Sequence, residues 1–274
     1  MSSELTLEDQ RLLEETLHRA ASRMTRREVL AGALSALGLA AATGGLWLLR
    51  PPGAFAVGPA LACFLVLVLS TRVRFDTPLG YTVPTQLAFV PLVFAIPGAI
   101  VPIAVTAAFM LAGGPELIRG EVPPSRLLMN LSNSCFSIGP VAVLAIAHVQ
   151  PEHAGAALLI AALAAQFVVD FSVSSLHVAI AREGNFSSLV RASWVHGIDA
   201  ALACVGLVVA EDIHSAPIAA LAVVPLLGLL ATFAHERHRR LQSMLELSSA
   251  YRGTALVLGD VIEADDGYTG EHCR

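Results

Sequence analysis

Lysine is absent from this chain, and charged residues of any kind are scarce. They make up 14% of the 274 residues, whereas soluble domains carry roughly 25%. Aromatic residues are also few, at 6%, while 55% of the chain is hydrophobic and the mean hydropathy is +0.68. A composition so poor in charge excludes an ordinary water-soluble domain, and it predicts an integral membrane protein.

Motifs for several common chemistries are missing as well. The four cysteines form no C-x-x-C pair, and three of them lie in apolar runs, so no disulfide is indicated. There is no P-loop, no G-x-S-x-G, and no G-x-G-x-x-G after a strand. The sequence therefore offers no motif for a nucleotide-binding site or a serine hydrolase, and an intramembrane enzyme has no recognisable nucleophile and base.

Long apolar stretches follow one another along most of the chain. A bilayer core of roughly 30 Å needs about 20 helical residues, which most of these stretches provide. They cover 29–49, 53–70, 79–96, 97–112, 127–149, 154–180, 192–210 and 215–234. We therefore expect an all-α fold, with a polytopic membrane helix bundle of about eight spans over 29–234. The charged segment 1–28 is expected to form a cytoplasmic N-terminal helix.

The block from Leu79 to Ala112 is ambiguous, because four prolines interrupt its 34 residues. It is either one long bent span, giving seven in total, or two short spans hinged near Pro97 and Gly98. The distribution of arginine favours the hinge, since it places almost every loop arginine on one side and leaves Arg50 opposite. By the positive-inside rule, this predicts a multi-pass protein of the cell (inner) membrane with both termini in the cytoplasm.

Polar residues recur on one face of the predicted sixth span. Gln166, Asp170, Ser174 and His177 follow steps of four, four and three, which is one helical stripe. His196 and Asp199 repeat a histidine and an acid near the next span, and Gln86 and Asn133 add polar groups elsewhere. Two interpretations stay open: a polar site that responds to a proton, an ion or a small ligand, or a set of interhelical hydrogen bonds.

After the last span the chain becomes polar but keeps a helical pattern. Positions at alternating steps of three and four are mostly apolar, which is nearly a coiled-coil seam. The seam positions are 241, 244, 248, 251, 255, 258 and 262. We expect a cytoplasmic linker helix over 235–263, which either joins two copies of the chain in a parallel homodimer or packs on a following domain.

The last residues, "LGDVIEADDGYTGEHCR", carry Asp266, Tyr268, Thr269 and His272 in a spacing close to D-x-Y-T-x-x-H-S-x-R. This pattern resembles the first helix of HD-GYP domains, metal-dependent phosphodiesterases of the HD superfamily that hydrolyse cyclic di-GMP. Cys273 stands where that family usually has Ser. The resemblance covers only about the last 20 residues, with a looser likeness of the membrane region to the sensory modules that precede such domains. It implies that residues 264–274 begin an HD-GYP-type domain.

The resemblance also implies a metal role for His272, with iron, manganese or zinc as cofactor if the full domain were present. Because the chain stops two residues after His272, we expect a truncated output domain without catalytic residues, no cofactor and no activity by itself. The expected function is a membrane sensor coupled to that output domain. The alternative is a small transporter or channel that uses the polar stripe. We expect the lipid bilayer and an unidentified small ligand as partners, and no nucleic acid.

Overall fold

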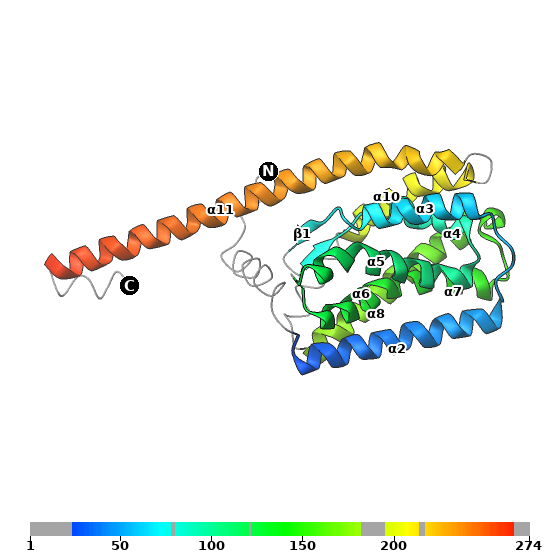
Figure 1. Ribbon diagram of the computed structural model, residues 1–274, viewed down its shortest axis with the longest axis horizontal. Coiled ribbons are helices and arrows are strands. Elements are labelled where there is room, and N and C mark those ends of the chain that lie inside the picture. Colours follow the sequence, from blue (N-terminus) through cyan, green and yellow to red (C-terminus); the bar gives the residue numbers. More distant parts are fainter. Residues whose placement is uncertain (1–23, 78–79, 121, 182–194, 214–216, 266–274) are drawn as a thin grey trace.

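The computed structural model describes residues 24–77, 80–120, 122–181, 195–213 and 217–265 (Figure 1). Apart from one short hairpin, these residues form helices that run back and forth along a common direction. The helices are α2 (Arg26–Leu49), α3 (Val57–Ser70), α4 (Gln86–Ala95), α5 (Val101–Ile118), α6 (Leu127–Ser134), α7 (Ile138–Ile146), α8 (Ala156–Ala181), α10 (Val195–Glu211) and α11 (Val223–Asp265). The predicted helical bundle is thus confirmed.

Short 3-10 segments join or extend several of these helices. They are η1 (Gly98–Ile100), η2 (Pro124–Arg126), η3 (Cys135–Ser137), η4 (Pro151–His153) and η5 (Pro217–Ala222). The hairpin pairs β1 (Phe75–Thr77) with β2 (Gly80–Thr82) in antiparallel register, Phe75 opposite Thr82. An all-α prediction omitted this hairpin, which occupies part of the stretch 79–96 that was expected to span the membrane.

Five helical segments of the described chain are long and apolar enough to cross a membrane. They are Arg26–Leu49, Gly98–Ile118, Pro124–Ile146, Ala156–Ala181 and Ala219–Met244. Large apolar side chains also face outward from the bundle, such as Leu48 (86% exposed) and Ile118 (87% exposed). These features fit an integral membrane protein in a lipid bilayer. Two further apolar helices, α3 and α4, are shorter, and the predicted count of about eight spans is not confirmed.

The predicted break at Pro97 and Gly98 is present. Helix α4 ends at Ala95, Ile96 is extended, and Pro97 precedes η1, from which α5 continues. Proline has no N–H to donate and disfavours the helical conformation in the residue before it, which fits the extended Ile96 at the end of α4. Proline alone does not end a helix here, since Pro91 lies inside α4. The segment before the break is shorter than predicted: α4 has 10 residues, which cover about 15 Å.

Successive connections lie at alternate ends of the bundle (Figure 1). The start of α2, the α3–β1 turn, the α5–α6 connection and the departure of α11 lie at one end, which we call the exit end. The α2–α3, α4–α5 and α7–α8 connections lie at the opposite end, which we call the closed end. Arg72, Arg74 and Arg119 follow α3 and α5 at the exit end, whereas Arg50 follows α2 at the closed end.

A capping box starts α2 at the exit end. The Thr25 hydroxyl accepts a hydrogen bond from the Glu28 backbone N–H at 3.2 Å, and the Glu28 carboxylate accepts one from the Thr25 N–H. Helix α2 therefore begins at Arg26, within the segment 1–28 predicted as a separate N-terminal helix. Residues 1–23 of that segment lie outside the described part of the chain.

Small residues set the closest helix contacts. A Cβ atom added to Gly139 of α7 would lie 2.5 Å from the backbone oxygen of Ala165 in α8. One added to Gly206 of α10 would lie 2.7 Å from the backbone oxygen of Gln86 in α4. Such separations are far shorter than van der Waals contact, so only glycine lets these helices approach so closely, as is common between membrane helices. Around α4, the core consists of large apolar side chains, of which Leu87 and Leu92 are completely buried.

We predict that Gly139→Ala destabilises the bundle. The new methyl group meets backbone rather than a flexible side chain, so α7 and α8 must separate, and overpacking of this kind costs about 1–3 kcal/mol. The measurement is the unfolding midpoint of the purified chain in detergent. The matched control is Gly38→Ala in α2, where an added Cβ meets nothing within 4 Å. Equal stability of the two variants would contradict the close contact.

Candidate functional site

The predicted polar stripe lies on α8, but its residues have different partners. Gln166 is buried, with 4% of the residue exposed, where α8 approaches Gly139 of α7. Asp170, Ser174 and His177 are half-buried. Asp170 contacts α10, whereas His177, two helical turns further along, contacts α2 and α6. The residues of the stripe therefore belong to two separate groups of contacts and do not line a single pocket.

His177 joins three helices through serine hydroxyls. Its Nε2 lies 3.1 Å from Ser132 Oγ on α6 and 3.5 Å from Ser35 Oγ on α2. Each hydroxyl donates its own hydrogen to a backbone oxygen of its helix, that of Ser132 to Leu128 and that of Ser35 to Ala31. With both oxygens left as acceptors, the tautomer that fits these contacts carries its proton on Nε2, which donates principally to Ser132. We call Ser35, Ser132 and His177 the serine–histidine cluster.

The serine–histidine cluster is well enclosed. Ser35 and Ser132 are 5% and 4% exposed. Cys135, one turn after Leu131, donates its thiol hydrogen weakly to the Ser35 and Leu131 backbone oxygens, with Sγ at 3.6 and 3.5 Å. Both serine hydroxyls and Nε2 of His177 have partners within the protein. Its evident role is interhelical hydrogen bonding, which is one of the two interpretations that the sequence left open.

The second cluster lies between α8 and α10. His196 Nε2 is 3.3 Å from Asp170 Oδ2, and the ring of Phe167 packs edge-on against the His196 ring, with centroids 4.8 Å apart. Asp199 follows one turn later on α10, on the same face of that helix as His196. We call Asp170, His196 and Asp199 the acid–histidine cluster. Two acids and an imidazole together can accept, hold and release a proton.

The acid–histidine cluster is less enclosed than its neighbour. The Asp170 side chain is 49% exposed and that of His196 is 24% exposed. The backbones of α8 and α10 make little direct contact, because α8 packs mainly on α7 and α10 mainly on α4. Asp170 is therefore reachable from outside the chain while its partner is held by α10. This accessibility distinguishes the pair from a closed structural hydrogen bond.

Gln86 and His272 belong to neither of the two clusters defined above. Gln86, at the start of α4, is 2% exposed, and its Oε1 has no hydrogen-bond partner among the residues that the structure describes. His272, the metal ligand implied by the resemblance to HD-GYP domains, lies outside the described residues. Within the described ranges, no three His, Cys, Asp or Glu side chains are grouped so as to hold a metal ion.

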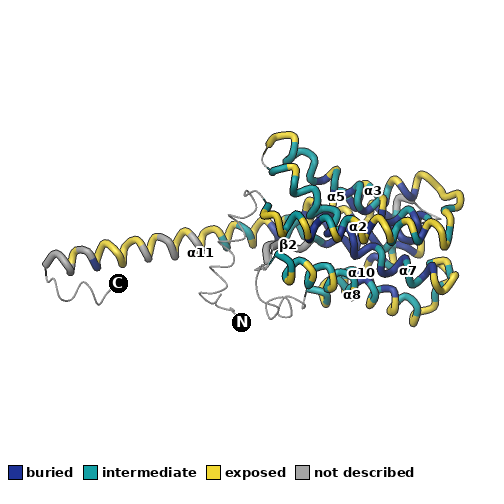
Figure 2. Tube along the Cα trace, turned by 90° about the horizontal axis from the view of Figure 1, so that it is seen from below, coloured by how far each residue is buried: buried dark blue, intermediate teal, exposed yellow. Residues whose placement is uncertain are grey.

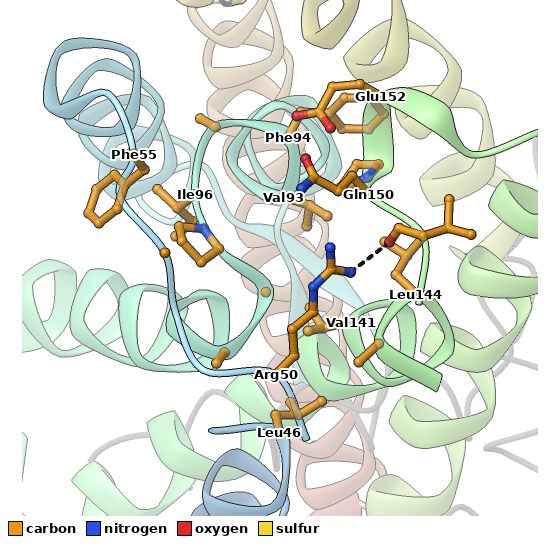
Figure 3. Close-up of a pocket in the computed structure, with 18 of the residues that line it drawn as sticks. Leu46, Arg50, Phe55, Val93, Phe94, Ile96, Val141, Leu144, Gln150 and Glu152 are labelled. Carbon is orange, nitrogen blue, oxygen red and sulfur yellow. Dashed lines mark hydrogen bonds between the residues drawn. The ribbon is translucent and has the colours of Figure 1, made fainter. Parts of the chain in front are cut away.

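A cavity at the closed end was missed by the sequence reasoning. It has a volume of about 270 Å³ and is lined by the ends of α2, α4 and α7 and by the connections that follow them (Figure 3). Arg50 reaches into it and donates from Nη1 to the backbone oxygen of Val149 at 3.1 Å. The one sequence signal was the position of Arg50 on the side opposite to the other loop arginines, and nothing local marked the apolar lining residues.

Comparisons with protein-family models, with curated proteins and with solved structures gave no match for this chain.

We predict a measurable energetic coupling between His177 and Ser132. A double-mutant cycle with His177→Phe and Ser132→Ala should give a coupling of about 0.6 kcal/mol or more, the usual size for side-chain hydrogen bonds between membrane helices. The free energies of unfolding are measured by SDS titration in mixed micelles. The matched control pairs His177→Phe with Ser172→Ala, since the exposed Ser172 hydroxyl donates to the Val168 oxygen of its own helix. A coupling no larger than that of the control would refute the assigned bond.

Proposed function

We propose that this chain is the membrane-embedded sensory part of a signalling protein whose HD-GYP-type output domain begins at its C-terminal end. The observation that carries the proposal is the continuity of α11. This helix runs unbroken for 43 residues from Val223 to Asp265, a length of about 65 Å. It begins within the bundle and continues far beyond it, directly to the segment that carries the HD-GYP-like motif (Figures 1 and 2).

The attachment of α11 to the bundle supports a mechanical role. Its first turns pack on η5 and α3, with Val223, Leu227 and Ala234 buried. Further along, α11 also passes β1 at the exit end. Beyond these contacts the helix is mostly exposed (Figure 2). A rearrangement of α3 or η5 would therefore displace α11 as a rod and move whatever follows Asp265, since an α-helix transmits axial displacement without compressing.

The arginine distribution supports the orientation in the membrane. We propose eight membrane-embedded helical segments, with the exit end in the cytoplasm, because the start of α2 and the arginines after α3 and α5 gather there. In this arrangement α11 leaves the membrane on the cytoplasmic side, where a cyclic dinucleotide would be found. Divalent metal ions would enter only with the complete output domain, through His272 and further ligands that this sequence does not contain.

Exposed apolar side chains on α11 support a homodimer. Met244, Tyr251 and Leu258 occupy the predicted seam and are 56%, 68% and 56% exposed. Two parallel copies of α11 would bury this seam and bring two output domains together.

We predict that Leu258→Cys, in a chain whose native cysteines are replaced, forms a disulfide between two copies in the membrane. The neighbouring Val257→Cys, equally exposed but outside the seam, should cross-link several-fold less, because its side chain would point away from the partner helix. The readout is the fraction of dimer on a non-reducing gel after mild oxidation. Equal cross-linking at the two positions would argue against the dimer.

The output domain has a separate test. Genomic DNA beyond codon 274 should encode an HD dyad, later metal ligands and a Gly-Tyr-Pro segment. The extended protein should hydrolyse cyclic di-GMP in the presence of manganese or iron, and the 274-residue chain should not. A genuine stop after codon 274 with no such sequence following would remove the output domain from the proposal.

The alternative function, a transporter or channel, is favoured by the partial exposure of Asp170. A Pro-broken segment packed against Asp170 would strengthen it, but the described contact of Asp170 is with His196 on the uninterrupted helix α10.

The alternative predicts that Asp170→Asn abolishes ion or proton flux into proteoliposomes, because the neutral amide cannot exchange a proton at neutral pH. Ser172→Ala on the same helix serves as the control. Flux that is equal in both variants and in empty liposomes would exclude the alternative.

A further inference from the structure

The cavity at the closed end belongs to neither polar cluster and plays no part in the proposed signal transmission. Apolar side chains form most of its wall, among them Val93 and Ile96 at the end of α4 and Leu144 of α7 (Figure 3). These three side chains are almost fully buried. A volume of about 270 Å³ lies just below the usual range for small-molecule sites, which begins at about 300 Å³. The cavity therefore has the size and character to enclose a short apolar group.

Arg50 provides the cation of this cavity. A guanidinium carries five N–H donors, and Nη1 of Arg50 donates to the Val149 backbone oxygen. Within the described part of the chain, the Arg50 guanidinium makes no other hydrogen bond or ion pair. Its positive charge thus faces the cavity without a carboxylate partner among the described residues. Two parallel N–H groups of one guanidinium match the oxygens of a carboxylate or phosphate.

The backbone holds the acceptor of Arg50 in a defined position. Helix α7 ends in a Schellman motif, in which the His148 N–H donates to the Ala145 oxygen and the Val149 N–H to the Leu144 oxygen. His148 takes the left-handed conformation that this motif requires, with φ at 55°. The Val149 carbonyl is therefore fixed, and it anchors one edge of the guanidinium while the other edge stays directed at the cavity.

The acidic residue of the cavity wall, Glu152, lies away from Arg50. Glu152 also lines the cavity, but it is exposed and lies near Phe94, and Figure 3 shows Gln150 between it and Arg50. An anionic group would be repelled from the Glu152 side and attracted to the Arg50 side. The charges of the wall thus orient a ligand with its anionic end at Arg50.

We propose that this cavity binds an amphiphilic anion, with a carboxylate or phosphate group on Arg50 and a short apolar chain against Val93, Ile96 and Leu144. This inference does not depend on the proposed signalling role, since binding can be measured without an output domain. Two kinds of molecule carry such a group: a soluble short-chain acid, and an anionic lipid whose head group enters from the bilayer. Both present the same oxygens to Arg50.

The test measures binding of octanoate to the full chain in phosphatidylcholine nanodiscs, with empty nanodiscs subtracted. We expect saturable binding of octanoate and at least tenfold weaker binding of octanol and octylamine, which lack the anion. Arg50→Gln should weaken octanoate binding at least tenfold. Arg72→Gln, which removes an exposed charge at the exit end, should leave it unchanged. Equal octanoate binding by the wild type and Arg50→Gln, or equal binding of octanol and octanoate, would overturn the proposal.

A second variant keeps the test decisive if Arg50→Gln fails to fold. Ala99 is buried in the apolar wall, and Ala99→Leu fills the cavity while Arg50 stays in place. Undiminished octanoate binding by a folded Ala99→Leu chain would overturn the proposal, and its loss would support it. Nanodiscs containing phosphatidylglycerol then identify the source. Competition with octanoate assigns the site to a lipid head group, and absence of competition assigns it to a soluble acid.

Discussion

The reversal of the chain at Pro97 and Gly98 is the constraint on which the rest of this architecture depends. A helix that continued through this point would place every later connection at the other end of the bundle. The extended conformation of Ile96 ends α4 there, and Pro97, which has no N–H to donate, follows it. Gly98 then allows η1 to approach α7 closely, since a Cβ there would lie 2.7 Å from the Val141 side chain. The break is tolerated because protein, rather than lipid, surrounds most of its backbone.

The same reversal creates the two ends of the molecule. The start of α2, the arginines that follow α3 and α5 and the exposed length of α11 lie at the exit end, whereas the cavity lies at the closed end. At the closed end the chain turns abruptly after α2, α4 and α7, and the three turns enclose the cavity between them. Arg50 lies there because α2 ends one residue earlier. We propose ligand binding at the closed end and signal transmission through α11 at the exit end. Both ends take their form from the single interruption of the helical pattern at Pro97.

Sequence reasoning predicted the helical bundle, the break and the continuous exit helix, because each depends on local patterns of apolar residues and proline. It could not predict the shortness of α4, since Gly80–Thr82 are as compatible with a hairpin as with a membrane segment until β1 is available to pair with them. The common face of Gln166, Asp170, Ser174 and His177 was also predictable from spacing. The division of that face between α10 and the α2–α6 pair was not, because it depends on how distant helices pack. The sequence marked Arg50 only because this positive charge falls on the side opposite to the other loop arginines. The cavity around Arg50 was not predictable, because it is formed by residues that are far apart in sequence, 46–56, 93–99 and 141–152.

Gly139 and Gly206 also bear on how relatives of this chain can be recognised. Apolar membrane helices exchange Leu, Ile, Val and Phe freely, so their sequences diverge with little physical penalty and soon lose detectable similarity. Positions where a backbone oxygen occupies the space of a side chain have no such freedom. In divergent proteins with this architecture, the distance in sequence between these two glycines and the Pro97–Gly98 break would persist as a fixed spacing, and it would align helices whose other residues no longer correspond.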